Sequence, residues 1–250
     1  MKLVISGGGA RISYLLGIKK YIEEKNILID EYSGSSSGSI FIVLMACKIS
    51  NNEIMKEYSK LIDDKIIFSN YKLDLVKKYL YKILPNNCHI LCTNKVNISY
   101  SYFKFPFIKN IITNKFKSKN HLIEIILASA SFPFFINKNL FYRYDNKLLL
   151  DGFFSNNTPL LEKNNSENQI IVKTYFRTIY DLDIFLYKKL SKTMKNLGYN
   201  HMKNFIEKGE TSIDFMISNN KYNTKLFLIL LLILLFFNIL KNVFYKKNLI

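Results

Sequence analysis

The sequence predicts an α/β fold with a mostly parallel central sheet. A short apolar strand at Leu3-Val4-Ile5 runs into a glycine loop and then an amphipathic helix. A second extended segment near Tyr32 ends in another turn of small residues, which an apolar helix follows. Strands that are joined through a helix usually pair in parallel, so this alternating order favours a parallel sheet. At 250 residues the chain can bury a substantial core.

The N-terminal helices are predicted from their apolar spacing. The helix expected over Ser13–Glu24 carries five apolar residues on one face: Tyr14, Leu15, Ile18, Tyr21 and Ile22. The segment Ile40–Ile49 is apolar almost all round, so we expect a buried helix there. Asn51 or Asn52 is a suitable N-cap for a further helix that continues to about Ile62.

The remaining elements are predicted from shorter patterns. These elements are helices over 72–84 and 123–130, and strands over 89–93, 97–103, 148–150 and 170–172. The helix over 123–130 is expected to stop before Pro133. Residues 177–224 are helical in places and carry no recognisable motif.

The segment Leu226–Leu240 differs sharply from the rest of the chain, because Asn238 is its one polar side chain. A helix of about fifteen to twenty residues spans roughly 22–30 Å, close to the ~30 Å hydrocarbon core of a bilayer. Lys225 and Lys241 can extend to the two interfaces. We expect a single membrane anchor over 225–245, with a buried core helix as the alternative. The expected organisation is a core domain over 1–175, a helical extension and linker over 176–224, and the anchor.

The composition narrows the possible partners. The net charge is +17, but the lysines are spread along the chain and no nucleic-acid-binding motif is present. We therefore expect no nucleic-acid partner, whereas an anionic membrane surface fits the charge. The odd set Cys47, Cys88 and Cys92 does not suggest a disulfide framework, and His89 alone does not complete a zinc site. We expect no metal or cofactor, and we expect the main part of the chain on the cytoplasmic side of a membrane.

The segment Gly34-Ser35-Ser36-Ser37-Gly38 has the spacing of a nucleophile elbow. A nucleophile on a tight strand-to-helix turn needs small neighbours, because the backbone is strained and adjacent elements pass close. The following helix would direct its N-terminal N–H groups at Ser36 and favour negative charge there. Taken alone, the pattern is more typical of a plain flexible turn.

The segment Gly7-Gly8-Gly9-Ala10-Arg11 can present free backbone N–H groups to an anion. A dinucleotide-binding loop would need glycine at the position of Ile12, and no Gly-Lys-Ser/Thr follows for a P-loop. For acyl transfer, the same loop could serve as an oxyanion hole beside Ser36.

The catalytic base is less obvious from the residues alone. Ser-His-Asp chemistry needs a histidine, and none of His89, His121 and His201 lies in a glycine-flanked turn. Asp151 ends an apolar run and precedes Gly152, which lets the chain turn sharply beside a site. A single Asp-Gly pair is more often only a turn.

The glycine loop, the Ser36 elbow and Asp151-Gly152, in this order, resemble the patatin-like phospholipases. Ala128-Ser129-Ala130-Ser131-Phe132-Pro133-Phe134-Phe135 is similar to the family's helix end before a Pro-aromatic turn, and Asn156-Asn157-Thr158-Pro159 to its Asn-Pro segment. The resemblance extends from residue 2 to about residue 175. It implies a three-layer α/β/α fold with a mostly parallel sheet.

The resemblance also implies the chemistry. Ser36 would be the nucleophile and Asp151 its base, elbow glycines Gly34 and Gly38 would shape the turn, and Gly152 would complete the Asp-Gly motif. The oxyanion hole would be formed by the loop Gly7, Gly8 and Gly9, with Arg11 shaping it. The expected reaction is hydrolysis of fatty-acyl esters of membrane glycerolipids, with the Phe132–Phe135 aromatics either lining an acyl channel or packing in the core.

Three positions depart from the family pattern: Ile12, Ser39 and Phe153. The family usually has glycine where Ile12 stands, and a β-branched residue resists positive φ. Because the expected oxyanion donors are backbone groups of Gly8 and Gly9, we expect activity to survive. The alternatives are a catalytically silent, membrane-anchored lipid-binding protein and a lipid transacylase with the same residues. The sequence does not indicate the oligomeric state.

Overall fold

The computed structural model describes residues 1–9, 11–63, 72–134, 136–161, 169–174, 191–210 and 212–214. These residues belong to one compact unit, Met1–Met216, and a second unit comprises Ile217–Ile250. The anchor expected over 225–245 lies outside the described residues, as do residues 176–190 and 215–224 of the expected extension. Among the described residues, no helix combines the length and apolar character that crossing a membrane requires.

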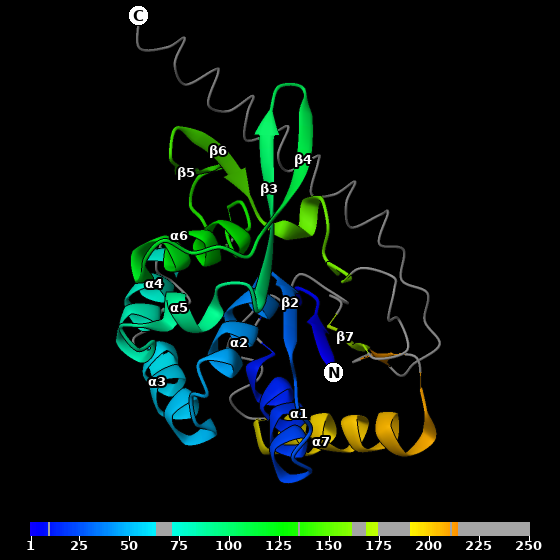
Figure 1. Cartoon of the computed structure of the whole chain (residues 1–250). Helices are drawn as coiled ribbons and strands as arrows, with labels where there is room; N and C mark the ends of the chain where they lie inside the picture. The colour runs from blue at the N-terminus through cyan, green and yellow to red at the C-terminus, as the bar shows by residue number, and fades with distance from the viewer. Residues whose placement is uncertain are drawn as a thin grey trace, which may run out of the picture. The chain divides into compact units, whose positions relative to one another are not determined.

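One sheet of eight strands forms the centre of this unit (Figure 1). The strands are β1 (Lys2–Ile5), β2 (Glu31–Ser35), β3 (Val96–Lys104), β4 (Phe107–Thr113), β5 (Tyr142–Tyr144), β6 (Lys147–Leu150), β7 (Gln169–Lys173) and β8 (Ile213–Asp214). They pair in the order β5-β6-β3-β2-β1-β7-β8, and β4 pairs with β3 in addition.

The sheet is mixed rather than mostly parallel. The pairs β3-β2, β2-β1, β1-β7 and β7-β8 are parallel, whereas β4 and β6 run antiparallel to β3, and β5 runs antiparallel to β6. Short turns join β3 to β4 and β5 to β6, and a short turn permits only antiparallel pairing. Strands β4 and β5 are not predicted from the sequence, and both pair antiparallel, so the sheet is less parallel than expected.

The helices agree with the prediction except in the middle of the chain. They are α1 (Ile12–Glu24), α2 (Ser37–Ala46), α3 (Asn51–Asp63), α4 (Lys72–Ile83), α5 (Cys88–Cys92), α6 (Lys119–Ser129), the short 3₁₀ helix η2 (Gly152–Phe154) and α7 (Ser191–Lys208). The N-cap of α3 is Ser50, whose Oγ accepts from the N–H of Glu53 at 3.2 Å, rather than Asn51 or Asn52.

The strand expected over 89–93 is wrong, because this segment forms most of α5. Cys88 and Cys92 are fully buried, whereas Ile90 and Leu91 are exposed. Burial at positions four apart is the helical period; a strand would have buried Ile90 together with the two cysteines. A short apolar run does not distinguish the two structures by itself, and the packing against the core decides it.

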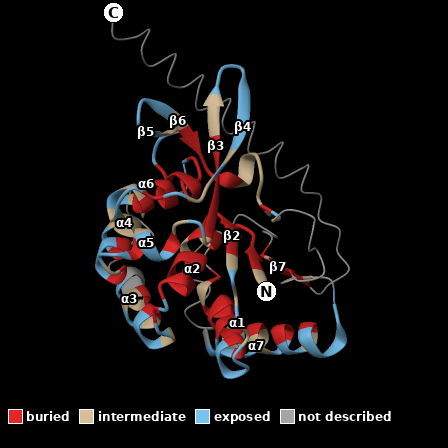
Figure 2. Ribbon diagram, in the orientation of Figure 1, coloured by how far each residue is buried: buried red, intermediate tan, exposed pale blue. Residues whose placement is uncertain are grey.

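The two faces of the sheet have different coverings. Leu3 and Ile5 of β1, and Val96 and Ile98 of β3, belong to one hydrophobic cluster with residues of α1 to α7. The inner surfaces of these helices and the central strands are buried, red in Figure 2. On the opposite face, the serines Ser33, Ser99 and Ser101 stand beside buried apolar residues such as Val4 and Leu150. The segment from residue 151 to 161 lies against these serines. A second helical layer, as a three-layer fold would have, is not among the described residues.

That segment is fixed to the sheet by three serine hydroxyls. Ser33 Oγ donates to the carbonyl of Pro159 at 2.6 Å, and Ser99 Oγ to the carbonyl of Asn156 at 3.0 Å. Ser101 Oγ donates to the carbonyl of Asp151 at 2.7 Å. Serines at alternate positions of a strand share one face, so the small polar residues of β3 hold the loop that begins with Asp151.

Candidate active site

The register of β3 brings Ser36 and Asp151 together. β2 runs parallel to β3 and its last residue pairs with Ser99, whereas β6 runs antiparallel and its last residue pairs with Ser101. β4 occupies one edge of β3 along residues 98–104, so β2 and β6 both pair with the other edge of β3. Because β2 is parallel to β3 and β6 is antiparallel to it, these two strands run toward each other. Ser36 follows β2 and Asp151 follows β6. The two residues therefore meet where these strands end.

The side chains of Ser36 and Asp151 are hydrogen bonded. Ser36 Oγ donates to Asp151 Oδ2 at 2.8 Å, and the N–H of Phe153 donates to Oδ1 at 2.9 Å. Asp151 is completely buried, which raises the pKa of its carboxyl from 3.8 to about 7, although both hydrogen bonds act in the opposite direction. A carboxylate with this pKa can accept a proton near neutral pH.

The backbone of Ser36 has the strained geometry of an elbow. Its φ of 52° and ψ of −129° lie in a region that residues other than glycine rarely adopt. Ser129 Oγ accepts from the N–H of Ser36 at 2.9 Å and donates to the carbonyl of Ser99 at 2.6 Å. This bridge ties the elbow to β3 and to the end of α6.

The elbow glycines leave room for neighbouring backbone. A Cβ on Gly38 would lie 2.4 Å from the carbonyl oxygen of Ile5, and a Cβ on Gly34 would lie 2.9 Å from the carbonyl carbon of Gly38. Helix α2 begins directly after Ser36, so the positive end of its dipole is at the hydroxyl. Ser39, one of the departures from the family pattern, donates its hydroxyl to the carbonyl of Ser36 at 2.6 Å.

The glycine loop lies against the nucleophile position. A Cβ on Gly7 would lie 2.6 Å from Ser36 Cβ, so the loop and the elbow are in direct contact. The N–H of Gly8 donates to Ser37 Oγ at 3.2 Å and thus faces the elbow. Gly9 has a φ of 67°, which glycine adopts without strain.

Two side chains hold this loop in place. Asn157 Oδ1 accepts from the N–H of Gly7 at 3.0 Å, and its Nδ2 donates to the carbonyl of Gly7 at 3.2 Å. Arg11 is buried, and its Nε donates to the carbonyl of Gly8 at 3.1 Å. Ile12 is the first residue of α1 and is not among the residues with positive φ, so the loop needs no glycine there.

Aromatic rings surround the Asp-Gly turn. Phe132 packs against Phe153 and Phe154, with ring centroids 5.8 and 5.4 Å away. These rings shield the turn from water and support the raised pKa of Asp151. A Cβ on Gly152 would lie 2.4 Å from both Ser35 Oγ and the carbonyl oxygen of Ser99, so the turn has no room for a side chain.

Two of the three histidines bond to groups other than Ser36, and the third lies on a separate helix. His201 Nδ1 bonds with the hydroxyl of Tyr14 at 2.9 Å, and His121 Nδ1 accepts from the N–H of Lys117 at 3.2 Å. His89 lies on α5. The hydroxyl of Ser36 is paired with Asp151, so the geometry favours a Ser-Asp pair over a Ser-His arrangement.

Sequence reasoning gave no role to Ser129, Asn157 or Ser37. Ser129 and Asn157 lie in the two segments that resembled the family, 128–135 and 156–159. These segments could have drawn attention to them, but which backbone group each side chain bonds depends on residues distant in the sequence.

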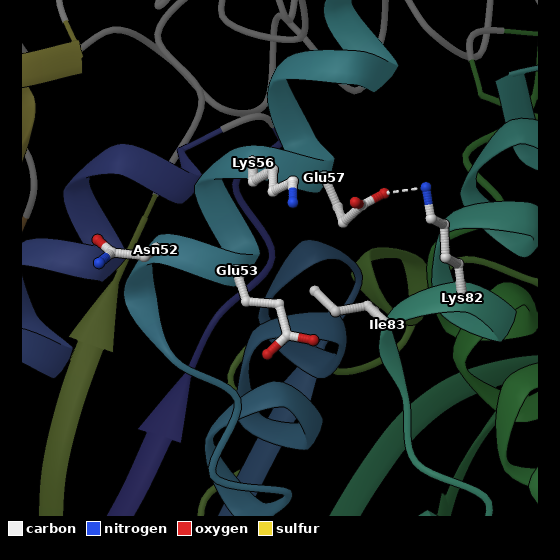
Figure 3. A pocket seen from close by; sticks show the side chains of 6 residues that line it. All are labelled: Asn52, Glu53, Lys56, Glu57, Lys82 and Ile83. Carbon is white, nitrogen blue, oxygen red and sulfur yellow. Dashed lines mark ion pairs between the residues drawn. The ribbon is translucent and has the colours of Figure 1, made fainter.

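A separate pocket lies between α3 and α4 (Figure 3). It is lined by Asn52, Glu53, Lys56, Glu57, Lys82 and Ile83. Glu57 forms an ion pair with Lys82 at 2.8 Å, as the dashed line shows. None of the predicted site residues lines this pocket, so we assign the chemistry to the Ser36–Asp151 site.

Comparison with known proteins gives one family. A model of the family described as Patatin-like phospholipase matches residues 3–162. The chain is 25% identical over 220 residues to "Probable lipid hydrolase 463L" of Invertebrate iridescent virus 6, which covers 76% of this chain and 74% of that protein.

Two further matches are to parts of longer proteins. The chain is 30% identical over 84 residues to "Patatin-like phospholipase domain-containing protein 5" of Mus musculus, covering 34% of this chain and 19% of that protein. It is 24% identical over 109 residues to "Omega-hydroxyceramide transacylase" of Homo sapiens, covering 41% of this chain and 20% of that protein. Each match spans about a fifth of the longer protein.

Proposed function

The chain belongs to the patatin-like phospholipase family, and we propose that it is a serine hydrolase that cleaves fatty-acyl esters of membrane glycerolipids. The observation that carries the proposal is the 2.8 Å hydrogen bond from Ser36 Oγ to Asp151 Oδ2. A hydroxyl bonded to a buried carboxylate with a pKa of about 7 is the pairing that direct base catalysis requires.

In the first half of the proposed reaction, Ser36 Oγ attacks the ester carbonyl carbon while Asp151 Oδ2 accepts its proton. The positive end of α2 and the N–H groups of Gly8 and Gly9 stabilise the oxyanion. The N–H of Gly8 donates to Ser37 Oγ in this structure, so the oxyanion would take the place of that hydroxyl. One such donor is typically worth about 10²–10³ in turnover.

In the second half, the intermediate collapses and the alcohol leaves with the proton held by Asp151. Water then gives a proton to the carboxylate and attacks the acyl-serine carbonyl. Collapse of this second intermediate releases the fatty acid and returns the proton to Ser36 Oγ. Asp151 therefore acts as base and acid in turn, a role that suits a pKa close to the working pH.

The proposal places this reaction at a membrane. The tail over 225–245 would anchor the protein, with the catalytic unit on the cytoplasmic side, and the net charge of +17 would draw it to anionic headgroups. Phe132 and its neighbours Phe153 and Phe154 are the proposed wall for the acyl chain, because they lie beside the Asp-Gly turn.

Lipid transacylation is a second candidate, favoured by the match to a protein named a transacylase. The acyl-Ser36 intermediate would be the same, and a lipid hydroxyl would replace water in the second half. The two activities differ in product: free fatty acid in one case and an acylated acceptor lipid in the other.

The decisive experiment compares the purified protein with Ser36→Ala and Asp151→Asn on glycerolipid esters. We expect each variant to lose at least about 10³-fold in kcat/KM, because both residues act in the same steps. Ser59→Ala on α3 and Asp145→Asn in the β5–β6 turn are the matched controls and should retain wild-type activity.

Covalent labelling separates an enzyme from a silent binding protein. An alkyl fluorophosphonate should label Ser36 in the wild type and leave Ser36→Ala unlabelled. If the folded wild-type protein is not labelled, the chain is a silent family member. If Asp151→Asn keeps full activity while His201→Ala loses it, the base assignment is wrong.

A further inference from the structure

The β3–β4 hairpin projects beyond the other described elements (Figure 1). Its tip and most of β4 are exposed, as the pale blue colour in Figure 2 shows. β4 lies beside β3. Most of its side chains are exposed, whereas those of the central strands are buried in the core.

The exposed side chains of this hairpin are large and apolar. Phe105 is 84% exposed and Phe107 is 67% exposed, and Ile108 and Ile112 are also exposed. The ring of Phe105 lies edge-on to Phe103, at 6.5 Å between centroids. A cluster of exposed aromatic and aliphatic side chains on a water-soluble surface costs free energy, and it generally marks an interaction site.

The charged residues of the hairpin and of the segment that follows it have a single sign. From residue 96 to residue 123 the chain contains no Asp or Glu, and it contains five lysines: Lys104, Lys109, Lys115, Lys117 and Lys119. Of these, Lys104 and Lys109 flank the exposed aromatic rings and are themselves exposed. Aromatic rings next to lysines are suited to the boundary between headgroups and acyl chains of an anionic bilayer.

The hairpin lies at the end of the parallel strands where Ser36 and Asp151 meet. β3 passes the dyad between Ser99 and Ser101 and then continues to Lys104 before the chain turns. At about 3.3 Å per residue, the tip lies roughly 15 Å beyond the dyad along the strand. This direction is the one in which β2 ends at Ser36, so the tip and the nucleophile are at the same end of the parallel strands.

We propose that the tip of the β3–β4 hairpin is a membrane-docking surface. Phe105 and Phe107 enter the interfacial region of an anionic phospholipid bilayer, and Lys104 and Lys109 contact lipid phosphates. The proposal rests on the proposed function, because a bilayer is the source of the glycerolipid substrate. Beyond that function, the proposal identifies the surface that contacts the lipid and the orientation of the Ser36–Asp151 site relative to the bilayer.

The test places a fluorescent probe at the tip of the full-length protein. Phe105→Cys is labelled with an environment-sensitive dye, and the three native cysteines are buried. Leu28→Cys is the matched control, since Leu28 is 79% exposed and precedes β2 at the opposite end of that strand. Phosphatidylcholine vesicles with and without phosphatidylserine are the membranes.

We expect the dye at position 105 to shift to an apolar emission and to be quenched by nitroxide lipids in phosphatidylserine vesicles. The dye at position 28 should stay in water. Replacing Lys104 or Lys109 by glutamine should each weaken binding to anionic vesicles by about five-fold, which corresponds to about 1 kcal/mol per lysine. Because this readout does not depend on catalysis, it remains valid if the protein hydrolyses nothing.

Activity gives an independent readout. Phe105→Ser with Phe107→Ser should lower hydrolysis of vesicle lipid by about ten-fold or more, given the apolar area lost, while hydrolysis of a soluble short-chain ester is unchanged. A dye at 105 that stays in water on vesicles overturns the proposal. An emission shift that occurs without vesicles and grows with protein concentration also overturns the proposal. It would show that the hairpin is an interface between two copies of the protein.

Discussion

At the scale of single residues, the site depends on the burial of Asp151. A carboxylate in water has a pKa near 4 and is a weak base, whereas complete burial raises the pKa of Asp151 to about 7. The hydroxyl of Ser36 and the N–H of Phe153 keep the buried group hydrogen bonded. In the proposed reaction, the burial of this carboxyl is what makes it an effective base.

This pKa predicts the pH dependence of activity. Only the deprotonated carboxylate accepts the proton of Ser36, so kcat/KM should rise about ten-fold per pH unit below about 7 and level off above it. A soluble ester, assayed from pH 5 to pH 9, avoids effects of lipid ionisation. A profile that is flat through pH 7 would contradict the assignment of Asp151 as base.

The same pKa predicts the pH dependence of stability. The folded pKa lies above the unfolded value of 3.8, so the contribution of this group to stability is complete below that pH and is lost as the pH rises to about 7. The loss is on the order of 4 kcal/mol at 1.36 kcal/mol per pKa unit. Asp151→Asn, which does not titrate, should therefore unfold later than the wild type in urea at pH 8, with a smaller difference at pH 4.

At the scale of elements, α1 and α7 pack closely through two glycines. A Cβ on Gly17 would lie 1.9 Å from the carbonyl oxygen of Lys195, and a Cβ on Gly198 would lie 2.0 Å from that of Tyr14. Next to this crossing, the hydroxyl of Tyr14 bonds with His201 Nδ1. The helices can approach to this distance because neither glycine has a side chain.

Gly198→Ala should therefore destabilise the protein. Alanine normally favours a helix over glycine by about 1 kcal/mol, but the added methyl would force the helices apart at a cost of about 1–3 kcal/mol beyond that gain. Asn196→Ala, at an exposed position of the same helix, is the control and should change the free energy of unfolding by less than about 0.5 kcal/mol. Urea denaturation measures both; equal midpoints for the two variants would show that the crossing tolerates a methyl group.

At the scale of the whole molecule, the chain comprises two units, and the proposed catalytic residues all lie in the first, Met1–Met216. The apolar segment over 225–245 belongs to the second. This division suggests that catalysis and anchoring can be separated experimentally.

A chain ending at residue 216 should hydrolyse soluble esters as the full chain does. Its membrane association should depend on charge as well as on the hairpin rings, so 1 M salt, where the Debye length falls to about 3 Å, should release most of it. The full chain should stay with the membrane in high salt, because an inserted helix does not depend on charge. Sedimentation of membranes with each protein measures this, and release of the full chain by salt would contradict the anchor.

The sequence by itself determined most of the elements and the motifs of the first unit, Met1–Met216. Apolar periodicity predicted α1, and continuous apolar runs predicted α2 and β1. The small residues around Ser36 and before Arg11 predicted two tight turns. Such signals are local, because side chains within one turn or strand decide them. The short apolar run that became α5, and strands β4 and β5, carried no decisive local signal.

The tertiary structure alone decided which distant residues meet. Ser36 and Asp151 are hydrogen bonded because β2 and β6 end at the same point of β3. Likewise, Cys47 and Cys92 have no paired spacing in the sequence, yet their Sγ atoms lie 3.8 Å apart in the core. The pairing register of strands fixes such distances, and register depends on the packing of the whole sheet rather than on any one segment.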